Sequence, residues 1–183
     1  MKIGLLVYEG FVDFEITLLL LLLRDKGELY VISVDESVVT SHGRLRVHAD
    51  RKIAAVAPRE IDLLVIPGGE PRIYADRVDI QSFISLVNQN GIPIAAICGG
   101  PEFLSQAGII KGRRITHGHD PEYASKIFSE SIIVDEDVVI DGNIITAKGQ
   151  AYAEFAVEVY GHLGFFGSEA EKDETLRWMK NIH

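Results

Sequence analysis

The chain has 183 residues, 47% of them hydrophobic, which is typical of one globular domain over residues 1–183 that needs no disulfide or metal to fold. The formal net charge of −9 disfavours binding to the phosphate backbone of nucleic acids. The longest apolar run, residues 16–23, is too short to span a membrane, and the single cysteine excludes an internal disulfide, so we expect a cytoplasmic protein.

Apolar β-type runs alternate with helical patterns along most of the chain. Strands are predicted over residues 2–8, 29–34, 61–66, 92–97 and 114–116. Helices are predicted from residue 11 to a stop at 26–27, around 80–87, and over 101–107, 122–128, 152–163 and 169–179. Hairpins are predicted over 38–48, at the edge of the sheet, and over 132–147.

Two of these helices have a predicted buried side. For the first helix, the predicted apolar face consists of Phe11, Phe14, Leu18, Leu21 and Leu22. For the last helix, Leu176 and Trp178 are expected to dock against the rest of the protein.

The alternation predicts an α/β fold, a three-layer flavodoxin-like sandwich with a mostly parallel central sheet and helices on both faces. In such a sheet, ligands bind at the carboxyl ends of the strands. We therefore expect three segments to meet there, which are residues 9–15, residues 67–71 and the turn at Cys98.

Cys98 lies between a predicted strand and the run Gly99-Gly100-Pro101. The flanking glycines permit the sharp bend of a nucleophile elbow, and Pro101 favours a helix that begins at once. The partial positive charge and free N–H groups of a helix N-terminus favour a thiolate, so we expect the pKa of Cys98 to lie below its ordinary value. The alternative is a structural cysteine buried at the end of a core strand.

Five other residues are candidates for the same site. Glu15 interrupts an apolar helix, and it either pairs with Cys98 as an acid or base or faces solvent. The backbone N–H groups of Gly68 and Gly69 suit an oxyanion hole, although a tight turn alone explains two glycines. A general base is available in His117 or His119, although surface histidines are common.

A metal site is less favoured than these assignments. His117, His119 and Asp120 have suitable ligand atoms, but the fold gives no reason for a fourth ligand beside them. We therefore predict neither a metal nor a cofactor.

At these residues the sequence resembles the DJ-1/PfpI superfamily, which is related to class I glutamine amidotransferase domains. The resemblance is carried by the nucleophile turn 96–101, the oxyanion loop 67–69, Gly10 followed by Glu15, and the later segments 115–117 and 146–149. It implies that Cys98 is the nucleophile and that Glu15 touches it. It also implies that a histidine of the pair His117 and His119 lines the pocket, and that the protein is a homodimer.

The sequence departs from the protease-like members of this family. Those members carry a histidine directly after the nucleophile, where this chain has Gly99, and a glutamate from a partner subunit, where this chain has Ile73. Both orienting groups of a Cys-His-Glu triad are missing, so we do not predict a protease. The chain is closer to the DJ-1-like branch, which implies an oxidation-prone thiol and glyoxalase-like or deglycase-like activity. The isocyanide hydratases of the family use a similar cysteine and acidic residue.

Three functions follow from these residues. The first is an enzyme whose Cys98 attacks a small electrophile, while Glu15 moves protons and the N–H groups of Gly69 and Gly99 hold the oxyanion. The second is a redox sensor or stress-response protein in which Cys98 oxidises to a sulfinate without turnover. The third is a binding module whose ancestral site has decayed.

Overall fold

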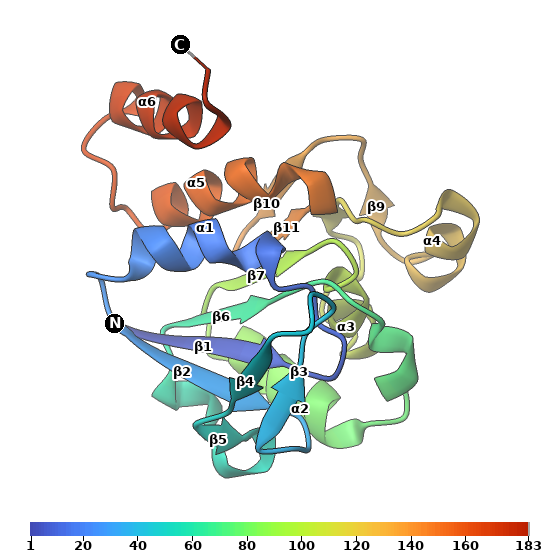
Figure 1. Ribbon diagram of the computed structural model, residues 1–183. Coiled ribbons are helices and arrows are strands. Elements are labelled where there is room, and N and C mark those ends of the chain that lie inside the picture. The colour runs from blue at the N-terminus through green and yellow to red at the C-terminus, as the bar shows by residue number, and fades with distance from the viewer. Residues whose placement is uncertain (183) are drawn as a thin grey trace.

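A computed structural model of the protein describes residues 1–182. Its centre is a seven-stranded sheet with the strand order β10-β11-β7-β6-β1-β2-β5 (Figure 1). All neighbouring strands in this sheet are parallel except β10 and β11. The strands are β1 (Lys2–Val7), β2 (Glu28–Ser33), β5 (Arg51–Lys52), β6 (Leu63–Ile66), β7 (Ile94–Ile97), β10 (Val138–Asp141) and β11 (Ile144–Ala147).

Helices cover both faces of the sheet, so the structure confirms the predicted α/β sandwich. In Figure 1, α1 and α5 lie on one face and α2 and α3 on the other. The helices are α1 (Phe14–Leu23), α2 (Val78–Gln89), α3 (Pro101–Gln106), α4 (Pro121–Ile127), α5 (Tyr152–His162) and α6 (Glu169–Lys180). Because β6 and β7 are covered on both sides, every residue of these two strands is buried.

Two small sheets lie outside the central one. The hairpin predicted over 38–48 forms as β3 (Val38–Thr40) and antiparallel β4 (Arg46–His48), but it is separate from the central sheet. It attaches instead to the loop after β1, where Gly10 N donates to Thr40 O. The other small sheet pairs β8 (Arg114–Ile115) with β9 (Ile132–Ile133), so the second predicted hairpin forms only over β10 and β11.

The buried face of α1 agrees only in part with the predicted one. Phe11 is buried and Leu18 and Leu22 pack partly against the core, as predicted. The residues that face the core are Ile16, Leu19 and Leu23, whereas Phe14 is 55% and Leu21 37% exposed. This helix is apolar on nearly every side, so its sequence has no clear period from which a face can be chosen. Packing of α1 against the sheet and α5 decides which leucines are buried.

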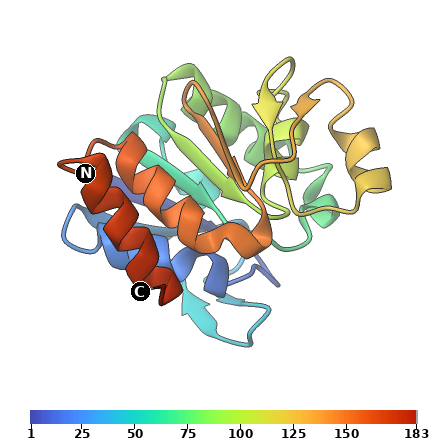
Figure 2. The same ribbon diagram turned by 90° about the horizontal axis from the view of Figure 1, so that it is seen from above.

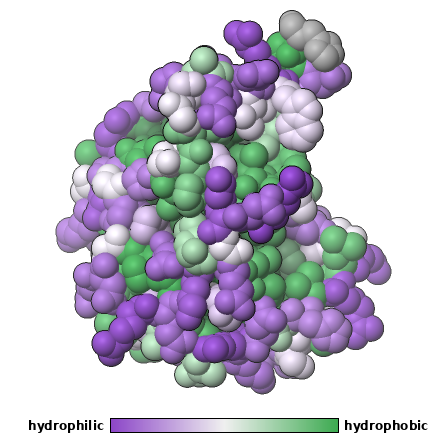
Figure 3. Space-filling view, turned by 90° about the vertical axis from the view of Figure 1, so that its left-hand side faces the viewer, coloured by the Kyte–Doolittle hydropathy of each residue, from purple (hydrophilic) through white to green (hydrophobic). Residues whose placement is uncertain are grey.

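The last helix, α6, is the outermost element and lies beside α5 (Figure 2). The prediction that Trp178 docks it is wrong, because this side chain is 68% exposed. Ion pairs of Lys172 with Glu158 and of Lys180 with Glu154 join α6 to α5, and Met179 packs against the core. The face in Figure 3 shows hydrophobic patches between hydrophilic side chains. Within residues 1–182, no helix has the length and apolarity needed to cross a membrane.

Candidate active site at Cys98

The three segments that we expected to lie together do so at the carboxyl ends of β1, β6 and β7. These strands are parallel neighbours, and they end on the side from which α4 projects (Figure 1). Gly68, after β6, donates its backbone N–H to Glu15 Oε2 of α1 over 2.8 Å. The side chains of Glu15 and Cys98 are hydrogen-bonded to each other. The structure therefore brings Cys98, Glu15 and the 67–71 segment together.

Cys98 itself carries the backbone bend, with φ at +60°. The expectation that the flanking glycines carry it needs correction, because Gly100 has a helical φ of −52°. Gly99 and Gly100 are needed for close approach instead. A methyl group on Gly99 would lie 2.7 Å from Gly69 O, and one on Gly100 would lie 2.7 Å from Ile66 O. A non-glycine residue with positive φ is strained and persists only where its surroundings hold it.

Glu15 is placed in the first turn of α1, which begins after the side chain of Asp13 caps Phe14 N. The side chain of Glu15 is only 2% exposed. Burial raises the pKa of Glu15 above its ordinary value, while hydrogen bonds from Cys98 and from Gly68 N oppose this rise. The prediction left open whether Glu15 faces solvent, and the structure shows that it faces the sulfur.

The pKa of Cys98 is raised to about 12. Burial is the largest cause, followed by the charge of Glu15 and the hydrogen bond to it, while the N–H of Gly99 lowers the value. The expectation of a depressed pKa is therefore wrong for the state in which Glu15 is ionised. The helix that follows Cys98, α3, has only six residues, and its favourable field is outweighed by burial and by the neighbouring carboxylate.

Three glycines from separate parts of the chain surround the sulfur, and we call the space between them the glycine slot. If a methyl group were added to each glycine, it would lie close to Cys98 Sγ. The distance would be 2.8 Å for Gly118, 3.0 Å for Gly149 and 3.1 Å for Gly68. The methyl group on Gly149 would also lie 3.0 Å from Glu15 Oε1. Any larger residue at these positions would displace the sulfur or the carboxylate, so the close packing around Cys98 requires glycine at all three.

The candidate oxyanion donors do not all remain available. Gly68 N–H is taken by Glu15, so the assignment of Gly68 as an oxyanion donor needs correction. Gly69 and Gly99 are adjacent, since a methyl group on Gly99 would lie 3.4 Å from Gly69 N. Gly69 has φ of +140°, and a methyl group there would lie 2.9 Å from the hydroxyl of Tyr8. These two amides remain the candidates for binding an oxyanion.

The predicted histidines lie on either side of Gly118, which is the residue of this loop that faces the sulfur. His117 Nδ1 accepts from His119 N over 3.1 Å, and the ring of His117 stacks on Phe128. Burial, and then the neighbouring His119, lower the pKa of His117. His117 lines a separate cavity of about 290 Å³ together with Lys148. A catalytic role for His117 stays a prediction.

Residues 1–161 match the model of the DJ-1/PfpI family. The chain belongs to this family. A deglycase from Thermococcus kodakarensis is 32% identical over 161 residues, which cover 84% of this chain and 94% of that protein. The deglycase PfpI of Pyrococcus furiosus is 32% identical over 158 residues, with the same coverage of both proteins.

Solved structures agree with the family assignment. A DJ-1 superfamily protein from Agrobacterium tumefaciens superposes with a TM-score of 0.85 at 29% identity, covering 100% of both chains. DJ-1β of Drosophila melanogaster superposes with a TM-score of 0.82 at 23% identity, over 97% of this chain and 96% of its own, which shows the shared fold.

Two buried polar residues beside the DJ-1/PfpI turn were not identified from the sequence as site residues. Glu102, in the first turn of α3, is only 3% exposed, and its carboxylate lies 3.3 Å from His119 Nε2. The hydroxyl of Tyr8 donates to Pro67 O over 3.0 Å, and burial raises the pKa of Tyr8 well above its ordinary value. A glutamate in the first turn of a helix is ordinarily a solvated start signal, so the pattern itself carries no sign of burial.

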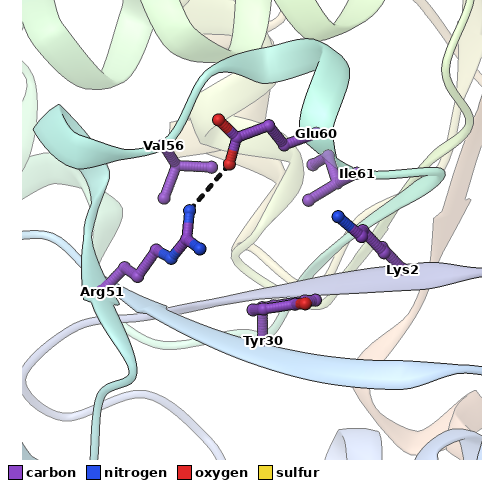
Figure 4. A pocket seen from close by; sticks show the side chains of 6 residues that line it. All are labelled: Lys2, Tyr30, Arg51, Val56, Glu60 and Ile61. Carbon is purple, nitrogen blue, oxygen red and sulfur yellow. Dashed lines mark hydrogen bonds and ion pairs between the residues drawn. The ribbon is translucent and has the colours of Figure 1, made fainter.

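A second cavity lies near the amino end of β1, and Figure 4 shows its lining. An ion pair of 2.7 Å joins Arg51 to Glu60 across it, and Lys2 lies near the ring of Tyr30. Its volume of about 10 Å³ holds no more than about one water molecule, so it is no substrate site. Among residues 1–182, no cluster of three or more His, Cys, Asp and Glu side chains is arranged to hold a metal ion.

Proposed function

We propose that this protein is an enzyme that uses Cys98 to attack small electrophilic carbonyl compounds, with glyoxalase-like or deglycase-like activity. The observation that carries the proposal is the hydrogen-bonded pair of Cys98 and Glu15, with the sulfur on a strained turn inside the glycine slot. The deglycase names of the archaeal relatives support the same class of reaction.

The raised pKa values indicate how the nucleophile forms. Cys98 is a thiol at neutral pH while Glu15 is ionised, so a preformed thiolate is not the starting state. Glu15, whose pKa is raised, is a suitable base to take the thiol proton as the sulfur attacks. The bond between sulfur and the carbonyl carbon forms, the carbonyl electron pair moves to oxygen, and the N–H groups of Gly69 and Gly99 stabilise that oxygen. Return of the proton from Glu15 to the oxygen gives a hemithioacetal.

A dicarbonyl substrate completes the reaction without an external oxidant or reductant. Transfer of a proton from the sulfur-bearing carbon to the neighbouring carbon, through an enediol, converts the hemithioacetal to a thioester. Water then hydrolyses the thioester to a 2-hydroxy acid and restores the thiol, so the net change is the addition of one water molecule. We assign these proton transfers to Glu15, because its carboxylate is hydrogen-bonded to Cys98.

The raised pKa of Cys98 weighs against redox sensing as the main role. Peroxides react with the thiolate, and a thiol whose pKa is about 12 is largely protonated at neutral pH. Hydration of an isocyanide begins with the same attack by sulfur, so it belongs in the same substrate screen.

Turnover of methylglyoxal, a glycated amine and an isocyanide by the wild-type protein tests the proposal. We expect turnover of at least one of them, its abolition in Cys98→Ala, and a fall of about 10²-fold or more in Glu15→Gln. Glu28→Gln, an exposed carboxylate at the amino end of β2, serves as the control and should keep full activity.

Full activity of Cys98→Ala, or no turnover of any of the three compounds, would contradict the proposal. A gain of two oxygen atoms on Cys98 under mild peroxide, in the absence of any turnover, would favour the redox sensor instead.

A further inference from the structure

The strained turn at Cys98 is held by two backbone hydrogen bonds from other parts of the chain. Cys98 N donates to Ala147 O over 2.8 Å, which continues the pairing of β7 with β11. Gly118 N donates to Cys98 O over 2.7 Å. The second bond comes from a loop outside the central sheet, so something else must fix that loop against the turn.

The loop is compact and its side chains are anchored. His119 N donates to His117 Nδ1, and the rings of both histidines pack against Phe128, which is buried. This arrangement gives residues 117–119 a defined shape. These contacts do not explain what holds the loop 117–119 against the turn at Cys98.

Glu102 makes that attachment. Its backbone N donates to Gly99 O over 3.0 Å, one residue beyond Cys98. Its buried carboxylate accepts from Tyr123 Oη over 3.0 Å and from Gln106 Nε2 over 3.2 Å, and its second oxygen lies 3.3 Å from His119 Nε2. A carboxylate buried to this degree is costly unless it is paired, and three polar groups from α3, α4 and the loop surround it.

We propose that Glu102 is a positioning residue for Cys98. Glu102 Oε2 and His119 Nε2 are both buried, lie 3.3 Å apart and have no hydrogen-bond partner within residues 1–182, so each is the nearest polar group available to the other. This close contact completes a ring that runs through Gly118 to Cys98 O and back through Gly99 to Glu102. It keeps Gly118 N–H on the carbonyl of Cys98 and keeps Gly118 close to the sulfur. Glu102 acts through His119 and does not touch the reacting atoms. Any effect of Glu102 on turnover rests on the proposed function. Its effect on the position of Gly118 against Cys98 does not.

Amide hydrogen exchange of the full-length protein tests the proposal directly. In Glu102→Ala, we expect exchange of the Gly118 amide to accelerate about tenfold, because the loop then opens more easily, while the amides of β1 and β6 stay unchanged. The rate at which iodoacetamide alkylates Cys98 should also differ from the wild-type rate in this variant. Glu102→Gln, which keeps the size of the side chain and can still accept from Tyr123, should restore both values toward those of the wild type.

Two further variants separate positioning from general destabilisation. His119→Phe keeps the ring against Phe128 but removes the contact with Glu102, so it should accelerate Gly118 exchange as Glu102→Ala does. Glu122→Ala removes an exposed carboxylate of α4 that pairs with Lys126, and it should leave Gly118 exchange unchanged.

Unchanged Gly118 exchange in both Glu102→Ala and His119→Phe would overturn the inference, whatever happens to turnover. Acceleration of every core amide together would also overturn it, because Glu102 would then only stabilise the fold. Faster Gly118 exchange alone, in a protein that turns over no electrophile, would support the positioning role and reject the proposed function.

Discussion

At the scale of single residues, the chemistry of this site depends on two groups that share a proton. Burial raises the pKa of both Glu15 and Cys98. The charge of Glu15 makes ionisation of Cys98 harder, whereas the hydrogen bond from Cys98 makes ionisation of Glu15 easier. The pair is therefore described best as one unit with a single negative charge near neutral pH. The sulfur becomes nucleophilic when Glu15 takes its proton, not by standing as a free thiolate.

The raised pKa of Glu15 has a consequence for stability. The folded state binds the Glu15 proton more tightly than the unfolded state, so the stability that Glu15 contributes is greatest at low pH and is lost as the pH rises through the folded value. Glu15→Gln, which carries no charge, should raise the free energy of unfolding at pH 7 by about 0.5–2 kcal/mol and cost activity.

Denaturant unfolding at pH 4 and pH 7 checks this prediction. At pH 4, Glu15 is protonated in the folded wild type, so the free energies of unfolding of Glu15→Gln and the wild type should differ little. An equal difference between variant and wild type at both pH values would show that Glu15 ionisation has no part in stability.

At the scale of elements, the leucines of the apolar helix α1 should differ in how much their substitution destabilises the protein. Leu19 is fully buried, whereas Leu21 is 37% exposed. Leu19→Ala should lower the free energy of unfolding by about 2–5 kcal/mol, because it removes buried methyl groups and leaves a cavity. The matched change Leu21→Ala should cost less than about 1 kcal/mol.

Urea denaturation of the two variants distinguishes the positions. Equal losses from Leu19→Ala and Leu21→Ala would mean that α1 is covered on both sides, as a partner subunit would cover it.

At the scale of the whole molecule, α6 lies outside the residues that match the family model and away from the site. The family match ends at residue 161, and α6 has no buried residue and joins α5 partly through ion pairs with partly exposed side chains. Such pairs contribute about 0–1 kcal/mol each. Deletion of residues 168–183 should therefore lower the melting temperature by only about 2–8 °C and leave the alkylation rate of Cys98 unchanged.

Calorimetry and iodoacetamide labelling of the shortened chain provide the measurement. Loss of the cooperative unfolding transition on deletion would show instead that α6 is part of the folding unit.

The amino-acid sequence by itself determined most of the strands and helices, the α/β class and the three segments that meet at the sheet edge. These features depend on local patterns, such as the apolar runs of β6 and β7 and the run from Cys98 to Pro101. Parallel pairing then brings the carboxyl ends of neighbouring strands to one edge without further information.

Only the tertiary structure decided how that edge functions. The burial of Glu15, the occupation of Gly68 N–H, the raised pKa of Cys98 and the contact of Glu102 with His119 each join residues that are distant in sequence. The sequence pattern around a glutamate on a helix is the same whether its carboxylate contacts water or sulfur. Which one it meets depends on the packing of other elements around it, and that packing sets the energy of its charge.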